Sequence, residues 1–99
     1  MIREIAELTI KPGTEAEFLA AVTKAVPVFK AAKGCKSMKL EKVVETPDTY
    51  RLMVLWETLE AHTVDFRESQ GFQDWRGLAG PFFAGAPNVY HAEVVVDGF

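Results

Sequence analysis

The segment at residues 50–56 restricts most strongly how this chain can fold. It reads YRLMVLW, and as a strand it is apolar on both sides. Leu52 and Val54 lie on one side, and Met53 and Leu55 lie on the other, because successive side chains of a strand alternate between faces. Such a strand belongs at the centre of a sheet, and both of its faces must be covered by other apolar surface.

The length of the chain leaves room for one domain. Its 99 residues are 48% hydrophobic and 25% charged, which is ordinary for a globular protein near the commonest domain size. Residues 1–99 are therefore expected to form a single domain. A chain this short buries only part of its apolar surface alone, so a second copy is a natural cover for the second face of the sheet.

The rest of the pattern predicts three more strands and two helical segments. Residues 2–11 alternate as a half-buried strand, with a shared side formed by Ile2, Ala6, Leu8 and Ile10. The other two further strands are expected at residues 35–45 and 89–96, and helical segments at 14–33 and 59–79. The order β-α-β-β-α-β is that of an α+β, ferredoxin-like split β-α-β motif, an antiparallel sheet with its helices on one face.

Local signals within the helical segments add detail. Thr14 and Glu17 have the spacing of a capping box, which satisfies amides of the first helical turn. Pro27 removes a backbone donor inside the first helix and predicts a kink or break there. In the second segment, Thr58 is placed to cap a short helix, and Gly71 and Gly77 are expected to divide the remainder of the segment into short pieces.

Charge and cysteine content exclude several classes of function. The formal net charge is −3, and 11 scattered Lys and Arg residues do not form a nucleic-acid surface. The single cysteine, Cys35, has no disulfide partner and no neighbours at zinc-site spacing, so no metal site is predicted. The N-terminus is not a secretion signal and no segment is apolar enough to span a membrane. A cytoplasmic protein with neither nucleic-acid nor membrane partners is expected.

The segment from residue 56 to residue 91 gathers the chemistry of the chain. Both tryptophans, both histidines and most of the phenylalanines lie there. Its ordered motifs are Trp56-Glu57, Ala61-His62, F-R-x-S-x-x-F-x-x-W-R from Phe66, and P-F-F from Pro81. With the KPGTEAEF stretch near the N-terminus, they make nearly the whole chain resemble the antibiotic biosynthesis monooxygenase family.

This resemblance implies a dimeric α/β barrel, in which two ferredoxin-like subunits press their sheets together and each holds a pocket between sheet and helices. The family includes cofactor-independent oxygenases of quinols and polyphenols, haem-degrading enzymes and isomerases. Superposition on the haem-degrading branch places Ala6, Phe66 and Arg76 where that branch carries an asparagine, a tryptophan and the iron-binding histidine. Arginine offers iron no neutral nitrogen lone pair, so no haem and no other cofactor is expected.

The candidate catalytic residues are His62, His91 and Arg76. Neutral imidazole suits a general base near pH 7, which could deprotonate a phenol so that it passes an electron to oxygen. Arg76 could clamp a phenolate or a carboxylate. Alternatively, His62 only packs a helix, and His91 only bonds a backbone group at the dimer surface.

Rings are expected to form the substrate-binding wall, with core filling as the alternative role. The candidates are Phe29, Phe66, Phe72, Trp75, Phe82 and Phe83. Trp56 is expected to be structural and to find a partner for its indole N–H. Arg67 is expected to pair with an acid such as Glu60 or Glu68.

The expected function is that of a cofactor-independent monooxygenase, a homodimer that oxidises a small quinol-like or polyphenol-like aromatic with molecular oxygen. Two alternatives stay open. One is a dimeric module that binds a small molecule without catalysis, and the other is an isomerase that shuttles a proton without oxygen.

Overall fold

The computed structural model describes all 99 residues and has the expected order of elements, with short additional helices. The strands are β1 (Ile2–Thr9), β2 (Cys35–Lys42), β3 (Thr49–Trp56) and β4 (Asn88–Ala92), and the α-helices are α1 (Glu15–Ala31) and α2 (Gln70–Ala79). A π-helix, η1 (Ala61–Phe66), precedes α2, and a 3-10 turn, η2 (Gly80–Phe82), follows it.

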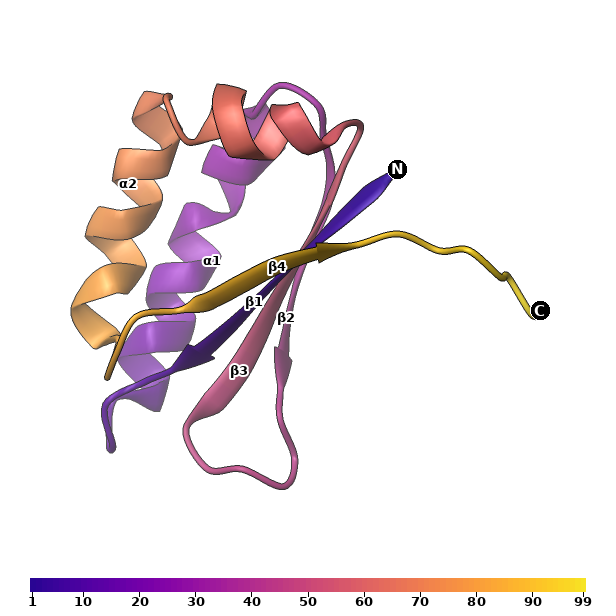
Figure 1. Cartoon of the computed structure of the whole chain (residues 1–99). Coiled ribbons are helices and arrows are strands. Elements are labelled where there is room, and N and C mark those ends of the chain that lie inside the picture. The colour runs from indigo at the N-terminus through magenta and orange to yellow at the C-terminus, as the bar shows by residue number, and fades with distance from the viewer.

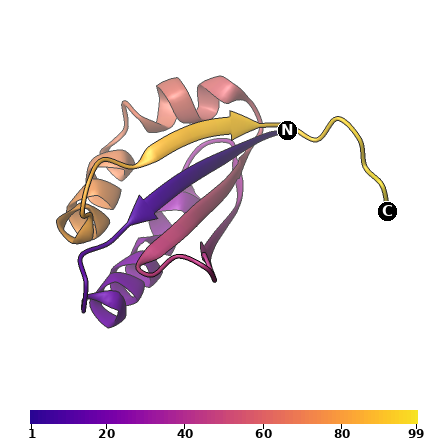
Figure 2. The same ribbon diagram turned by 60° about the horizontal axis from the view of Figure 1, so that its bottom comes forward.

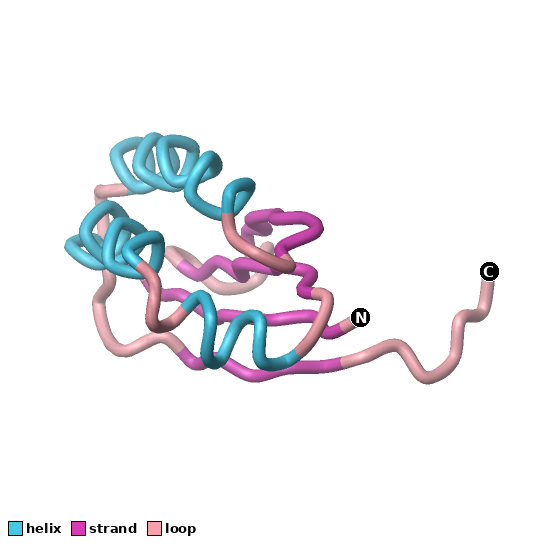
Figure 3. Tube along the Cα trace, turned by 90° about the horizontal axis from the view of Figure 1, so that it is seen from above, coloured by secondary structure: helices cyan, strands magenta, loops and turns pink.

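The four strands form one antiparallel sheet in the order β2-β3-β1-β4. Figure 1 and Figure 3 show α1 and α2 side by side on one face of this sheet. The α+β, ferredoxin-like fold is therefore confirmed, and β3 has a neighbour on each side, as its apolar sequence predicted.

The core lies between the helices and the even-numbered residues of β1 and β3. On β3, Tyr50, Leu52, Val54 and Trp56 are buried against the helical layer. The helical side is the stripe of α1 that the sequence indicated, whose buried residues are Phe18, Val22, Ala25 and Phe29. The opposite, outer sheet face carries Ile5, Arg51, Met53, Leu55 and Tyr90, and no element of the chain covers it.

Three local expectations about the helices were wrong. Thr14 does not form a capping box, because its hydroxyl donates to the Lys11 carbonyl at 2.6 Å and caps no amide. The first helix runs unbroken through Pro27, which lies on its exposed side, where water can bond the carbonyl left without a donor. Gly71 and Gly77 both lie inside α2.

The division of the second helical segment occurs at Ser69 instead. Its hydroxyl accepts a hydrogen bond from the Phe72 amide at 3.3 Å and donates to the Phe66 carbonyl at 2.6 Å. Ser69 therefore caps α2 at the point where η1 has ended. The predicted cap at Thr58 is confirmed, since its hydroxyl accepts from the Ala61 amide at 3.1 Å.

The last strand is shorter than expected and ends at Ala92 instead of residue 96. Its partner β1 pairs Arg3 with Ala92 and begins one residue earlier, so no strand remains for later residues to pair with. Residues 93–99 extend away from the body of the protein, as Figure 2 shows, and expose Val94, Val95, Val96 and Phe99. Neither α-helix is both long and apolar enough to cross a membrane.

Gly34 and Gly13 provide a stability test of how η1 is seated. Both have a φ of 79°, but a Cβ on Gly34 would lie 2.9 Å from the Ala61 Cβ, whereas one on Gly13 would meet nothing within 4 Å. Gly13→Ala should cost about 1 kcal/mol for its left-handed backbone. Gly34→Ala should cost about 1–3 kcal/mol more, because the start of η1 must move. Urea unfolding measures both, and equal losses would contradict the close packing of Gly34 against η1.

Candidate functional site

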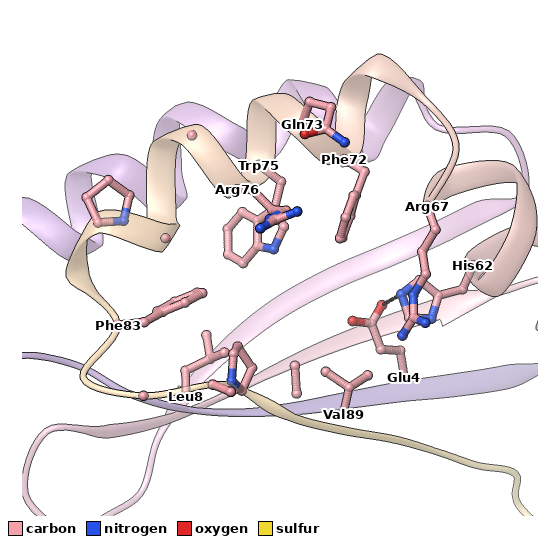
Figure 4. Close-up of a pocket in the computed structure, with 17 residues that line it drawn as sticks. Glu4, Leu8, His62, Arg67, Phe72, Gln73, Trp75, Arg76, Phe83 and Val89 are labelled. Carbon is pink, nitrogen blue, oxygen red and sulfur yellow. Dashed lines mark ion pairs between the residues drawn. The ribbon is translucent and has the colours of Figure 1, made fainter.

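A cavity of about 1000 Å³ lies between α2 and the β1–β4 edge of the sheet. Figure 4 shows its side chains converging from both layers. β1 provides one wall with Glu4, Ala6 and Leu8, and α2 provides the other with Phe72, Trp75 and Arg76. His62, Arg67 and Phe83 complete the part of the lining that carries chemistry. This volume is at the upper end of the range for small-molecule sites.

A buried carboxylate lies at the end of the cavity near η1. Glu4 is 5% exposed, and its Oε1 accepts a hydrogen bond from the Trp56 indole N–H at 3.0 Å. The same oxygen lies 3.3 Å from Nε2 of His62. Trp56 itself is fully buried at the end of β3, so its N–H finds the partner that the sequence predicted.

The two histidines of the chain meet beside this carboxylate. Nδ1 of His62 lies 2.7 Å from Nε2 of His91, although the residues are 29 positions apart. With both rings neutral, the His62 Nδ1 accepts from the His91 Nε2–H, and the His62 Nε2–H then faces the Glu4 oxygen. A hydrogen bond from Trp56 to Glu4, a 3.3 Å contact between Glu4 and His62, and a hydrogen bond between His62 and His91 therefore connect the four residues in a row.

The local sequence explains why these groups converge. Residues 4 of β1 and 91 of β4 are directly paired, so both point to the helical side of the sheet. His62 comes from η1, whose start is capped by Thr58, and its ring stacks on the Trp56 indole with centroids 5.3 Å apart. A π-helical turn is a frequent feature of functional sites.

Burial disfavours the charged form of each of the three ionisable residues, Glu4, His62 and His91. It raises the pKa of the Glu4 carboxyl to about 7, although the Trp56 hydrogen bond and the Arg67 charge act in the other direction. It lowers the pKa of His62 to about 4, with further lowering by the charges of His91 and Arg67. The pKa of His91 is lowered by burial and then by Arg67. The carboxylate of Glu4 is thus the most basic of the three groups.

The structure places the predicted catalytic residues close to one cavity, in different positions. His62 and Arg76 line the cavity, whereas His91 does not and contacts it only through His62. Arg76 is exposed, and its guanidinium lies 5.8 Å from the centroid of the Phe72 ring. The nitrogens through which His62 and His91 meet face each other, and no group of three side chains is arranged to hold a metal ion.

The six predicted wall residues separate into two sets. Phe72, Trp75 and Phe83 line the cavity. Phe29 and Phe66 do not, because they stack on each other in the core at 5.1 Å, with exposures of 1% and 3%. Phe82 also turns away and packs edge-on against Phe18. The last three are structural in this fold.

Sequence reasoning missed Glu4 and misplaced Arg67. Glu4 has the same parity as the apolar residues Ala6, Leu8 and Ile10, so a strict period of two would have placed a carboxylate among the inward-facing side chains of β1. Arg67 forms no ion pair with Glu60 or Glu68 and lines the cavity instead. Nothing in its spacing indicated this, because the turn at residues 67–69 sets its direction.

Comparison with known proteins adds relatives to this geometry. Residues 1–78 match the family model described as antibiotic biosynthesis monooxygenase. The uncharacterized protein YczJ of Bacillus subtilis is 42% identical over 95 residues, which cover 96% of this chain and 100% of YczJ.

Solved structures share the architecture. A Bordetella bronchiseptica protein with a provisional description as an antibiotic biosynthesis monooxygenase superposes with a TM-score of 0.94 at 46% identity, covering 96% of this chain and 97% of that one. A Caulobacter crescentus protein of the same provisional description gives a TM-score of 0.82 over 96% of this chain and 90% of that one. At 23% identity, this second likeness shows the fold alone.

The burial of Glu4 has a measurable consequence for stability. Its native pKa of about 7 is above its ordinary value of 4.5. The stability that the neutral carboxyl contributes is therefore fully present below pH 4.5 and is lost as pH rises through 7. The free energy of unfolding of Glu4→Gln, compared with that of the natural chain, should therefore rise by about 3 kcal/mol from pH 4 to pH 8. Urea unfolding at both pH values measures this. Glu7→Gln, which removes an exposed carboxylate from the same strand, is the control, and a constant difference for Glu4→Gln would contradict the buried titration.

Proposed function

The chain belongs to the antibiotic biosynthesis monooxygenase family, and from that membership we propose that it oxidises a small aromatic molecule, quinol-like or polyphenol-like, with molecular oxygen. One observation carries this proposal. The cavity joins ring walls to a buried carboxylate and histidine at one end. Apolar walls favour burial of a flat molecule, and the few polar groups orient it.

The walls suit a substrate with one or more aromatic rings. Phe72, Trp75 and Phe83 present ring surface to the cavity from the helical layer and the loop before β4. Arg67 and Arg76 lie on the same lining. Their positive charges stabilise an anion of the substrate, since a guanidinium favours both charge and ring contacts.

Oxidation of such a substrate with molecular oxygen needs only a proton acceptor, ring walls and positive charge from the protein. A phenol or an anthrone-like ketone that loses a proton becomes an electron-rich anion, which can pass an electron to oxygen without a flavin, a haem or a metal. Conversion of a ring methylene to a carbonyl then places one oxygen atom in the product and releases the other as water. The protein must bind the substrate, remove its proton and stabilise the anion.

An isomerase is the second candidate, and the row of proton-carrying groups formed by Glu4, His62 and His91 favours it specifically. A group that takes a proton from one atom of a bound substrate can return it to another atom, and no oxygen is then consumed. Dependence of the reaction on oxygen therefore separates the two functions. A passive binding module would show neither reaction.

We further propose that the protein is a cytoplasmic homodimer, paired through the outer sheet face defined above. Met53 and Leu55 are only partly covered there, and Tyr90 is 41% exposed. Nε of Arg51 lies on this face, buried and without a hydrogen-bond partner. A second copy related by a twofold axis would cover all of these groups, because such an interface is self-complementary.

Oxygen uptake with hydroquinones and anthrone-like phenols tests the proposed reaction. Phe83→Leu should raise KM several-fold, because the side chain lines the cavity. Phe82→Leu is the matched control and should leave KM unchanged, because Phe82 packs on Phe18 instead. Turnover of these compounds without oxygen would support the isomerase. Binding without turnover in either condition would contradict catalysis.

Light scattering tests the dimer. The natural chain should have twice the 11.0 kDa mass of one copy. Met53→Glu should give a monomer, since it places charge on the outer face while Lys39, its cross-strand partner, preserves the fold of each copy. Val26→Glu, at an exposed position of α1, should remain dimeric. A monomeric natural chain would refute this pairing.

A further inference from the structure

We propose that Glu4, rather than either histidine, takes the proton from the substrate, and that His62 and His91 act behind it as a proton relay. The proposal deepens the function proposed above and rests on it for the class of substrate. Its basis is which polar atoms of the site are already engaged and which are free.

Neither histidine presents a free ring nitrogen to the cavity. Both ring nitrogens of His62 are engaged, Nε2 with Glu4 at 3.3 Å and Nδ1 with His91 at 2.7 Å. His91 has an unengaged Nδ1, but its side chain is not part of the cavity lining. A general base must lie within hydrogen-bond reach of the proton that it removes. Neither ring meets this requirement for a molecule in the cavity.

Glu4 meets it through its second oxygen. Oε1 is held by the Trp56 N–H and the His62 ring, and no hydrogen bond engages Oε2. Nε of Arg51 is the one side-chain nitrogen or oxygen that is fully buried and has no hydrogen-bond partner. Because Oε2 of Glu4 also has no partner, it is not fully enclosed by protein atoms. Figure 4 shows one carboxylate oxygen directed to His62 and the other toward the open space below Phe72.

The proton transfer balances within the site. The O–H or acidic C–H bond of the substrate breaks, its electron pair stays on the substrate, and a new O–H bond forms on Oε2. Negative charge thereby leaves a buried carboxylate and spreads over the substrate rings, in a cavity whose lining includes Arg67 and Arg76. The neutral acid at Glu4 later returns the proton to the oxygen atom that leaves as water.

The relay sets the resting charge of Glu4 without direct access to solvent. While Glu4 is charged, the His62 Nε2 proton can pass to Oε1, the His91 Nε2 proton then passes to Nδ1 of His62, and Nδ1 of His91 takes a proton from water; the reverse sequence returns the carboxylate. Each ring ends neutral, with its tautomer exchanged. His91 is half-buried on the edge strand β4, where this last transfer reaches solvent.

The charges that face Glu4 agree with this role. Arg67 follows η1 and lowers the pKa of the carboxyl, whereas burial raises it to about 7. On β2, burial raises the pKa of the Cys35 thiol, and the nearby Glu4 charge raises it further. His62 faces Glu4 from η1, and His91 faces His62 from β4. A base with a pKa near 7 combines availability and strength at neutral pH, which His62, at about 4, does not.

Exchange of the methylene protons of anthrone for deuterium in D2O, followed by NMR without oxygen, tests the base directly. The natural chain should accelerate exchange, with a rate that rises with pH through about 7. Glu4→Gln, which can still accept from Trp56, should lose about a hundredfold of the enzymatic rate, and Glu4→Asp should restore part of it. Glu7→Gln, on the outer face of the same strand, is the control.

His91→Gln tests the relay. Its amide can still donate to His62 but cannot pass a proton on. Exchange with solvent deuterium should fall several-fold, whereas oxygen uptake should fall less and KM should not change. Loss of packing alone would not produce this difference between the three measurements. Equal loss of exchange, oxygen uptake and binding would refute the relay.

The outcomes separate this inference from the proposed function. Exchange by the natural chain without oxygen uptake would refute the oxygenase and leave Glu4 as the base. Oxygen uptake that survives Glu4→Gln at the natural rate would refute Glu4 and leave the oxygenase. Loss of exchange in His62→Gln but not in Glu4→Gln would make the histidine the base.

Discussion

A carboxylate placed in the inward-facing register of β1 is the constraint on which the rest of the site depends. A buried charge is costly unless it is hydrogen-bonded, and Glu4 recruits one donor from the end of β3 and one from η1. These contacts tie Trp56 and His62 to the sheet. The same contacts leave Oε2 free, so an arrangement that limits the cost of burial also defines which atom meets the cavity.

The fold could be predicted from the sequence because its signals are periodic and local. The alternation in β1 and β3 and the apolar stripe of α1 each repeat over several residues and agree with one topology. Signals that depend on a single residue were less reliable. Thr14 had the spacing of a cap and bonded Lys11 instead, and Pro27 was tolerated because it faces solvent.

The candidate site was predictable only in part, because its key contacts join residues far apart in the chain. His62 and His91 were both identified by residue type, yet their 2.7 Å contact depends on the pairing of β4 with β1 and on the place of η1. Ring content could not separate Phe83, on the cavity, from Phe82, on the core, because one step along the backbone reverses the direction of a side chain.

The edge position of β4 connects the chemistry to the architecture. Because β4 is paired on one side only, a residue on it can be packed against η1 and still lie near solvent. A histidine on the central strand β3 would be enclosed and could not exchange protons with water. The order of the strands therefore determines that a proton path can exist at His91. Pairing of two copies through the outer face would leave this path intact, since His91 lies on the helical side of the sheet.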